Sequence, residues 1–195
     1  MFLVAGLGNP GEEYARTPHN LGFLVVDRLA ENHGIRVTRK DSRAVIGLGE
    51  IGGRAVMLAK PQTFMNLSGT SVKALIEKHG LAASDLVLIY DELDLPWTAL
   101  RIKPRGSGAG HNGVESVIRS LGTSDFIRVR LGIHPGRPVR DGAEFVLAPF
   151  RRSQEKELGE FVGYAADAVS SIITEGVEKA MTNFNRRAQG SIEEA

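Results

Sequence analysis

The stretch FLVAGLGNPGEEYARTPHNLGFLVV, residues 2–26, decides the fold class. Its first part belongs to the apolar run at 1–7, which is typical of a short buried strand closed by glycine. A helical pattern follows over 17–34, where Thr17 is suited to cap the helix and Pro18 to occupy its first position. A strand that leads into a helix is the repeating unit of α/β proteins.

The segment GLGNPG, residues 6–11, also spells the G-x-G-x-x-G pattern of dinucleotide-binding proteins. That pattern needs a helix to begin within the glycines, so that the helix N-terminus meets the pyrophosphate. Pro10 pushes Asn9 away from helical angles, and the helix is expected only near residue 18. Glu31 has the spacing of a ribose-binding acid but falls inside that helix. We therefore interpret the glycines as a tight turn that presents Asn9.

Strands and helices alternate along the rest of the chain. The sequence predicts a hairpin over 43–60 turning at Gly52-Gly53, a helix over 68–79, strands at 86–90, 100–103 and 126–133, a helix after Asn112, and helical structure over about 153–187 broken near Gly176. The predicted fold class is therefore α/β, a single domain of residues 1–188 with a mixed, mostly parallel twisted sheet and helices on both faces. Residues 189–195 are expected to form a disordered tail.

Polar segments follow four of these strands, after residues 7, 60, 90 and 103. Ligands of such folds bind beyond the carboxyl ends of the strands, so we expect the four segments to converge at one edge of the sheet. The segment at 91–96, DELDLP, is expected to be an acidic loop.

Composition excludes several kinds of chemistry. The chain of 195 residues has no cysteine, which removes thiolate nucleophiles, disulfides and cysteine-based metal sites. Its net charge of +1 favours neither nucleic acid nor any other partner. No apolar run approaches the roughly 20 residues of a membrane span, and no secretory signal is present, so we expect a cytoplasmic protein without membrane contact.

His19 and Asp91 are the first candidate catalytic pair. The start of a helix disfavours a protonated imidazole, and a neutral imidazole is what a general base requires. Asp91 directly follows the strand at 86–90 and could orient one nitrogen of His19. Each residue also has a plain structural interpretation: a helix-terminal surface histidine and an aspartate that starts a turn.

Three asparagines, Asn9, Asn66 and Asn112, occupy comparable places beyond strands. Neutral amides can donate to a developing oxyanion or hold a substrate, although Asn112 could simply cap the helix that follows it. The chain has no G-x-S-x-G nucleophile motif, and its histidines appear in no metal-binding pattern. The residues thus favour water-mediated hydrolysis of an acyl bond.

Basic residues alternate along two strands. Arg101, Lys103 and Arg105 share one face of a strand, and Arg128 and Arg130 are expected to point outward from the next strand. Such residues are usually a solvated strand face. Together, flanking a glycine-rich segment, they would also suit a polyanionic substrate.

Four motifs in this order resemble the bacterial peptidyl-tRNA hydrolases: GLGNPGEEYARTPHNLGF, KPQTFMNLSG, YDELDLP and GSGAGHNGVESVIRSLGTSDFIRVRLGI. The resemblance runs from about residue 3 to 150 and weakly into the C-terminal helices. It implies a single α/β domain with a mixed sheet. It also implies hydrolysis of the ester between peptide and tRNA, which releases both for recycling, with no metal or organic cofactor.

The same resemblance implies roles for individual residues. His19 would activate water, Asp91 would orient it, and Asn9 and Asn66 would support the oxyanion and the peptide end. Asn112 would position substrate or water.

Binding roles follow in the same way. The peptide cleft would include Tyr14, Met65 and the loop Leu93–Pro96, and the tRNA phosphates would be clamped by Lys103 and Arg130. The chain departs from the family pattern at Ser107 and Ala109, where glycine is usual, and at Pro18, where arginine is common. Ser107 and Ala109 put the mobility of the glycine-rich loop in doubt, whereas Pro18 would stiffen the helix start and remove one basic contact.

Two other functions stay open at this point. A dinucleotide-dependent enzyme would use the glycine pattern, and a non-catalytic RNA-binding module would use the basic strands. With 6% aromatic residues the chain offers little stacking surface for a binding module. We expect a monomer whose partner is peptidyl-tRNA.

Overall fold

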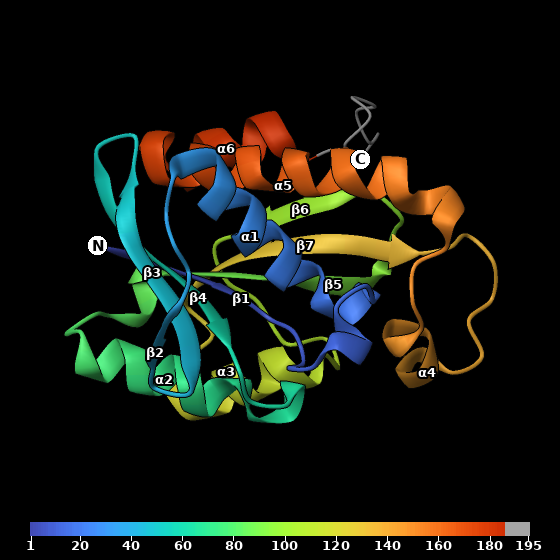
Figure 1. Ribbon diagram of the computed structural model, residues 1–195, viewed down its shortest axis with the longest axis horizontal. Helices are drawn as coiled ribbons and strands as arrows, with labels where there is room; N and C mark the ends of the chain where they lie inside the picture. Colours follow the sequence, from blue (N-terminus) through green and yellow to red (C-terminus); the bar gives the residue numbers. More distant parts are fainter. Residues whose placement is uncertain (186–195) are drawn as a thin grey trace.

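Seven strands form one sheet at the centre of the protein, whose computed structural model describes residues 1–185 (Figure 1). The strands are β1 (Phe2–Gly6), β2 (Arg39–Asp41), β3 (Ala44–Ile51), β4 (Arg54–Pro61), β5 (Leu86–Pro96), β6 (Leu100–Lys103) and β7 (Ile127–His134). Their order across the sheet is β2-β3-β4-β1-β5-β7-β6. The central strands β4, β1, β5 and β7 run parallel, and the outer pairs β2–β3, β3–β4 and β6–β7 are antiparallel. The predicted mixed sheet is confirmed, with its parallel part at the centre.

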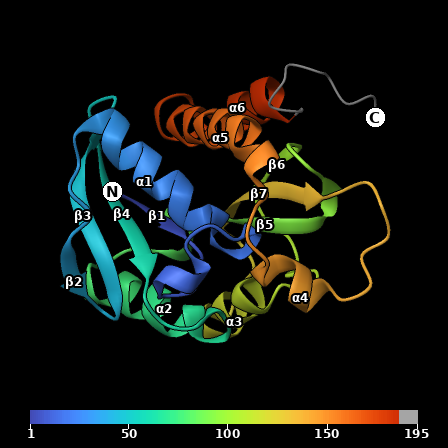
Figure 2. The same cartoon turned by 45° about the vertical axis from the view of Figure 1, so that its right-hand side comes forward.

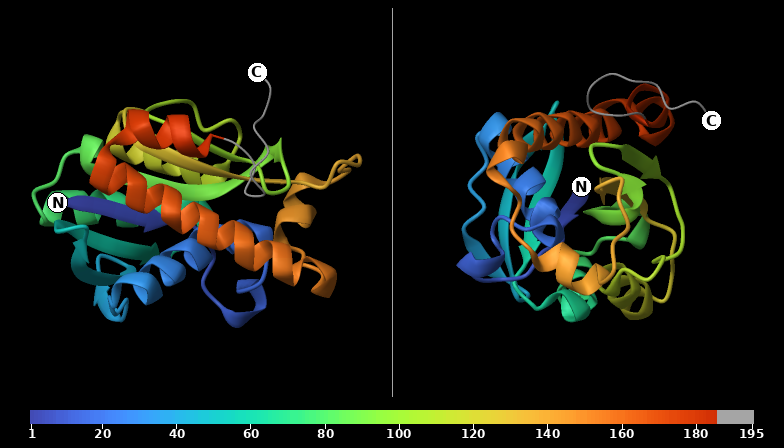
Figure 3. Two further views of the ribbon diagram at one scale, coloured as in Figure 1. Left: turned by 90° about the horizontal axis from the view of Figure 1, so that it is seen from above. Right: turned by 90° about the vertical axis from the view of Figure 1, so that its right-hand side faces the viewer.

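Helices cover both faces of the sheet (Figure 2). One face carries α1 (Leu21–His33), α5 (Glu155–Glu175) and α6 (Val177–Phe184), and the other carries α2 (Ser68–Lys78) and α3 (Asn112–Leu121). The end-on view in Figure 3 shows these layers and the short helix α4 (Gly142–Leu147) beyond the strand ends. Short 3-10 turns complete the elements: η1 (Glu12–Tyr14), η2 (Pro18–Asn20), η3 (Met65–Leu67), η4 (Ala83–Asp85) and η5 (Arg152–Gln154).

Alternation along the strands divides the core into two clusters. In β1, Leu3 and Ala5 pack with α2 and α3, whereas Val4 packs with α1 and α5. All three side chains are fully buried, because a central strand lies between two layers of helices. No helix among the described residues has the length and apolarity needed to cross a membrane.

The glycines of the 6–11 segment serve the packing of α1 on β1. A Cβ atom at Gly6 would lie 2.1 Å from the carbonyl oxygen of Gly22, and one at Gly8 would lie 2.8 Å from the ring of Phe23. A Cβ at Gly22 would in turn lie 2.4 Å from the backbone nitrogen of Leu7. The strand and the helix therefore touch backbone to backbone, which requires glycine at these positions.

The N-terminal helix begins later than the sequence predicts. Residues 18–20 form η2, and α1 starts only at Leu21. Thr17 does not cap a helix with its side chain, because its hydroxyl donates to the carbonyl of Tyr14 at 2.8 Å. Gly34, with a φ of 63°, ends α1 as predicted.

Several other predictions are confirmed. The hairpin of β3 and β4 turns at Gly52 and Gly53, which both have positive φ. The C-terminal helices break at Gly176, and α2 ends before Gly80. The predicted domain end at 188 and the tail at 189–195 lie outside the described residues.

The acidic segment at 91–96 is not a loop, and this prediction is wrong. β5 continues through Pro96, paired with β7 across a register shift between Glu92 and Pro96. The helix α4 and the short strand β2 were not predicted.

The glycine-rich segment after β6 starts at the opposite edge of the sheet from the other three polar segments. β6 is antiparallel to β7, so its carboxyl end lies beside Arg128, near the start of β7. Residues 104–111 then return along the sheet to the start of α3 (Figure 1). The four polar segments therefore do not all emerge at one edge, although three of them do.

We expect Gly22→Ala to destabilise the protein by about 1–3 kcal/mol, because the added methyl group would overlap the backbones of Leu7, just after β1, and of Ile89 in β5. Gly159→Ala is the matched control: it lies within α5 with open space around its Cβ, and should stabilise by up to about 1 kcal/mol. Urea unfolding of both variants measures the difference. If the two variants had equal free energies of unfolding, the close contact of α1 with β1 would be contradicted.

Candidate active site

A cavity of about 530 Å³ opens at the carboxyl ends of β1, β4 and β5. It is lined by Asn9, His19, Phe64, Met65, Asn66, Asp91, Glu92, Leu93, Asp94, Ala109, Gly110, His111, Asn112, Gly142, Ala143, Val146 and Leu147. These residues come from segments far apart in the sequence. The cavity thus joins the three polar segments with the start of α3 and with α4.

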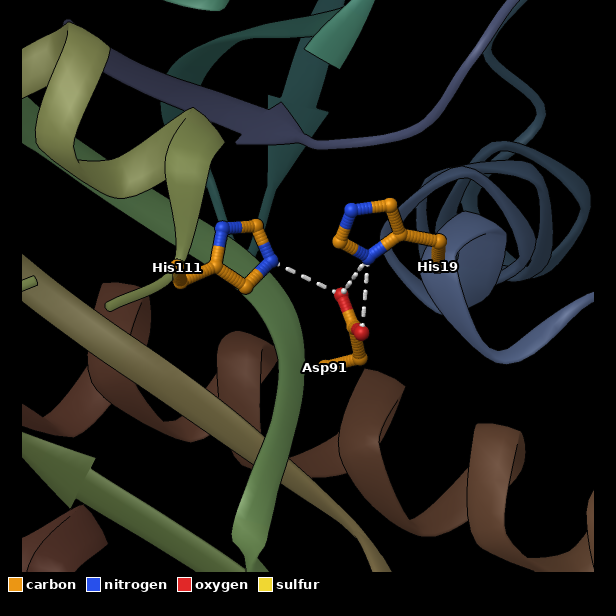
Figure 4. Close-up of side chains that lie close together, drawn as sticks. All are labelled: His19, Asp91 and His111. Carbon is orange, nitrogen blue, oxygen red and sulfur yellow. Dashed lines mark hydrogen bonds and ion pairs between the residues drawn. The ribbon is translucent and has the colours of Figure 1, made fainter. Parts of the chain in front are cut away.

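At the floor of the cavity, Asp91 lies between two imidazole rings (Figure 4). Its carboxylate is 2.8 and 3.0 Å from Nδ1 of His19 and 2.9 Å from Nε2 of His111. The two rings have their centroids 4.9 Å apart. The prediction that Asp91 orients His19 therefore has the contact that it requires, and His111 joins them.

The tautomer of His111 follows from its second nitrogen. Nδ1 faces the backbone N–H groups of Gly113 and Val114, at 3.1 and 3.3 Å, and must accept from both. The proton of the neutral ring is then on Nε2, from which it donates to Asp91. His111 is thus the N-cap of α3 and a hydrogen-bond donor to Asp91 at once.

His19 is held in the orientation that a base requires. Its Nδ1–H donates to Asp91, so that the neutral ring keeps Nε2 as an acceptor. Nε2 lies on the side of the ring away from the carboxylate (Figure 4). The side chain is 13% exposed, which leaves it reachable from the cavity while the Asp91 carboxylate stays buried.

Asp91 stays ionised. Burial raises the pKa of its carboxyl group, but the electrostatic attraction and hydrogen bonds of the His111 and His19 N–H groups outweigh burial and hold that pKa well below its usual range. A fixed negative charge therefore lies beside the Nδ1 side of the His19 ring.

The histidines are not all scattered, contrary to the sequence-based expectation. His19, Asp91 and His111 bring three possible metal-ligand atoms within 4.8 Å of one another. A metal on Nε2 of His111 would require the proton on Nδ1, where two backbone N–H groups point at that nitrogen. The cluster therefore fits hydrogen bonding better than metal coordination.

A hydrogen bond to its side-chain oxygen holds Asn9 in place, and its side-chain nitrogen is still available as a donor. Its Oδ1 accepts from the backbone N–H of Met65 at 2.8 Å, which sets the orientation of the amide group. Nδ2 makes no hydrogen bond to any residue within 1–185, and the side chain lines the cavity. This leaves one oriented N–H donor beside His19.

The other predicted site residues fall into two groups. Met65, Asn66 and Asn112 line the cavity. Asn112 is not the cap of α3, since His111 holds that position, so its predicted capping alternative is wrong.

Tyr14, Lys103 and Arg130 lie outside the cavity lining, as do Leu95 and Pro96 of the predicted cleft loop. Tyr14 belongs to η1, where its carbonyl group accepts the hydroxyl of Thr17.

The basic residues of β6 and β7 share one face of the sheet. Lys103 pairs with Arg128 and Arg101 with Arg130 across the two strands. Partial burial, and then the charge of Arg130, lower the pKa of Arg101, as expected where like charges crowd together.

Arg128 does not point to solvent as predicted, being 1% exposed. Its guanidinium group donates to the carbonyls of Gly106, Ser107, Ser124 and Phe126. It therefore pins the first half of the glycine-rich segment.

Arg130 is also largely buried. Its Nε and Nη2 donate to Glu92 at 3.1 and 2.8 Å, and its side chain is 15% exposed. Lys103 is exposed and is free of such a carboxylate among the described residues.

Sequence reasoning missed His111 and α4 as parts of the site. The signal for His111 was its position directly before the apolar pattern of α3, where a cap is needed. No comparable signal marks α4, whose apolar residues Val146 and Leu147 face the cavity.

Comparison with known proteins agrees with this geometry. The family model described as peptidyl-tRNA hydrolase matches residues 3–191. A protein named peptidyl-tRNA hydrolase from Solibacter usitatus (strain Ellin6076) is 74% identical over 190 residues, 97% of either chain. One of the same name from Koribacter versatilis (strain Ellin345) is 48% identical, over 97% of this chain and 94% of its own.

Solved structures give the same result. The Arg119Gln mutant of peptidyl-tRNA hydrolase from Acinetobacter baumannii superposes with a TM-score of 0.87 at 34% identity, covering 96% of either chain. A complex of peptidyl-tRNA hydrolase with N-propanol gives a TM-score of 0.88 at 32% identity, over 96% of this chain and 95% of the other. The chain belongs to the peptidyl-tRNA hydrolase family.

Proposed function

We propose that the chain hydrolyses the ester bond between the peptide and the 3′ ribose of peptidyl-tRNA, with His19 as the base that activates water. The activity follows from the family of the chain, and the roles of the residues are our proposal. The observation that carries these roles is the buried Asp91 carboxylate bonded to Nδ1 of His19 at the floor of the cavity.

The reaction needs one proton to move twice. Nε2 of His19 takes a proton from water as the water oxygen attacks the ester carbonyl, and Asp91 stabilises the imidazolium that results. When the tetrahedral intermediate collapses, the imidazolium returns the proton to the departing 3′ oxygen. Free tRNA and a peptide with a carboxyl end are the products.

Neutral amides support the oxyanion. Nδ2 of Asn9 is an oriented donor beside His19, which is the arrangement that stabilises charge as it develops on the carbonyl oxygen. Asn66 and Asn112 line the same cavity and would hold the peptide end and the water.

The peptide would lie along the apolar side of the cavity. Phe64 and Leu147 are 57% and 40% exposed, unusually high for large apolar side chains, and both line it together with Leu93 and Met65. Exposed apolar patches of this kind mark binding surfaces. Tyr14 would support this region from η1 without lining it.

The tRNA phosphates would meet the basic face of β6 and β7. Lys103 supplies an exposed charge there. Arg130 is already bonded to Glu92, so it would act on the tRNA only through its contribution to the electrostatic potential of this face. One chain supplies every residue of the site, so we infer a monomer. It would act in the cytoplasm, where ribosomes make its substrate.

We expect His19→Ala to lower kcat by about 10²–10⁴-fold, the usual contribution of a general base, with the fold retained. His33→Ala, at the other end of α1 and bonded to Ser170, is the control and should keep full activity. The assay is release of N-acyl-amino acid from tRNA, with circular dichroism to verify folding. Full activity of the His19 variant would end this proposal.

The bond from His111 to Asp91 can be separated from its capping role. His111→Asn keeps a good N-cap but is too short to reach Asp91, whereas His111→Ala loses both bonds. We expect both variants to lose about 10–100-fold in kcat, because a hydrogen bond to a charged group contributes about 1.5–3 kcal/mol. Only the alanine variant should lose a further ~1 kcal/mol of stability. Wild-type kcat in both variants would show that Asp91 needs no second donor.

Lys103→Ala should raise KM at low salt and lessen the slope of log KM against log salt by about 1, as loss of one phosphate contact predicts. Arg130→Ala should raise KM as well, but also destabilise the protein by about 3–5 kcal/mol because Glu92 is left buried without its partner. Lys179→Ala, in an exposed i,i+4 pair on α6, is the control. An unchanged salt slope for Lys103→Ala would remove that residue from the tRNA contact.

A further inference from the structure

Asn9 and Asn20 are joined by a reciprocal pair of hydrogen bonds. Oδ1 of Asn20 accepts from the backbone N–H of Asn9, and Nδ2 of Asn20 donates to the carbonyl oxygen of Asn9, both at 2.9 Å. Asn20 is 2% exposed and Asn9 is 7% exposed. The side-chain amide of Asn20 thus pairs with the backbone N–H and C=O of Asn9, as one residue pairs with another across two β-strands.

These bonds hold Asn9 at three points. Its N–H and its C=O are bonded to Asn20, and its side-chain oxygen is bonded to Met65. The Nδ2 group is the one polar group of Asn9 left over among these contacts, and Asn9 lines the cavity. The direction of Nδ2 is therefore set by groups on both sides of the residue.

Asn20 directly follows His19 in the chain. Its backbone N–H donates to the carbonyl of Thr17 at 3.1 Å, which keeps both residues in η2. Two consecutive residues therefore supply the imidazole, from His19, and the two hydrogen bonds that hold the backbone of Asn9, from Asn20. Any shift of Asn9 relative to His19 would have to break the two bonds to Asn20.

We propose that Asn20 is a positioning residue for the hydrolytic reaction, which fixes Asn9 so that its Nδ2 meets the carbonyl oxygen under attack by the water that His19 activates. Asn20 does not touch the substrate. The inference rests on the proposed function, because it assigns Asn20 a task only through Asn9 and His19. A displacement of about 1 Å in such a group can cost on the order of 100-fold in rate.

Asn20→Asp tests this role with a change that pH can reverse. A protonated carboxyl group has one donor and one acceptor, as the amide has, and can make both bonds to Asn9. An ionised carboxylate has no donor, and its second oxygen would face the carbonyl oxygen of Asn9. The ratio of variant to wild-type kcat should therefore be near 1 at pH 5.5 and fall by about 30–100-fold by pH 8. His19 and Asp91 are the same in both proteins, so the ratio isolates the effect of the residue at position 20.

Asn185→Asp is the matched control. The side chain of Asn185 bonds to Ile102 in the same way, accepting from its N–H at 2.6 Å and donating to its C=O at 3.2 Å, on the edge strand β6. It does not line the cavity. Its kcat ratio should stay flat between pH 5.5 and 8, whereas its melting temperature should depend on pH as that of Asn20→Asp does.

Each outcome decides the inference. A fall in kcat ratio with pH at unchanged KM, absent in Asn185→Asp, supports it; a flat ratio, or an effect on KM alone, overturns it. If Asn20→Asp does not fold, Asn20→Ser is compared with wild type at pH 8, where lower kcat at unchanged KM supports the role and wild-type kcat overturns it. Activity of His19→Ala would instead refute the proposed function, whatever the Asn20 variants do.

Discussion

The backbone contact between Gly6 and Gly22 is the constraint on which the rest of the site depends. It brings the first turn of α1 against the end of β1, at a separation that no side chain at either position would permit. Asn9 lies just beyond that end of the strand, and His19 and Asn20 lie just before α1. A looser contact would separate the amide from the imidazole, so the close packing of two elements sets the distance between two functional groups.

The buried carboxylate of Asp91 is the second constraint on the site, and it acts through hydrogen bonds and charge instead of packing. A charge buried to this degree is costly unless it is hydrogen-bonded, and here both imidazoles bond to it. Each ring is thereby fixed in one tautomer, with His111 further locked by the start of α3. The carboxylate thus joins η2, β5 and α3, so that the same bonds hold these elements together and orient the His19 ring.

Much of the fold could be predicted because apolar periodicity is local. The strands β1, β3 and β4, the turn at Gly52-Gly53 and the break at Gly176 follow from patterns within a few residues. Arg128 shows the limit: its burial depends on carbonyl groups of residues 106 and 107, which reach it only in the folded chain. The strand at 91–96 was missed for a related reason, since its acidic residues are tolerated where β5 extends toward the cavity and Glu92 meets Arg130. His111 combines two roles, and its position before α3 indicates only the cap, because the bond to Asp91 joins residues 20 positions apart.

The protein offers charged side chains to one proposed part of the substrate and neutral side chains to the other. The face of β6 and β7 carries the exposed Lys103, proposed to meet phosphates, while the groups proposed to meet the scissile carbonyl are amides. An amide donates without releasing a proton, so Asn9 can stabilise an oxyanion without competing with His19 for the proton that the base must take. A lysine in its place would add a second titrating group and raise the cost of protonating His19. Asn9 occupies a variable position of the G-x-G-x-x-G pattern, and it is the residue that supplies the neutral donor. The glycines before it allow α1 to approach the end of β1 closely.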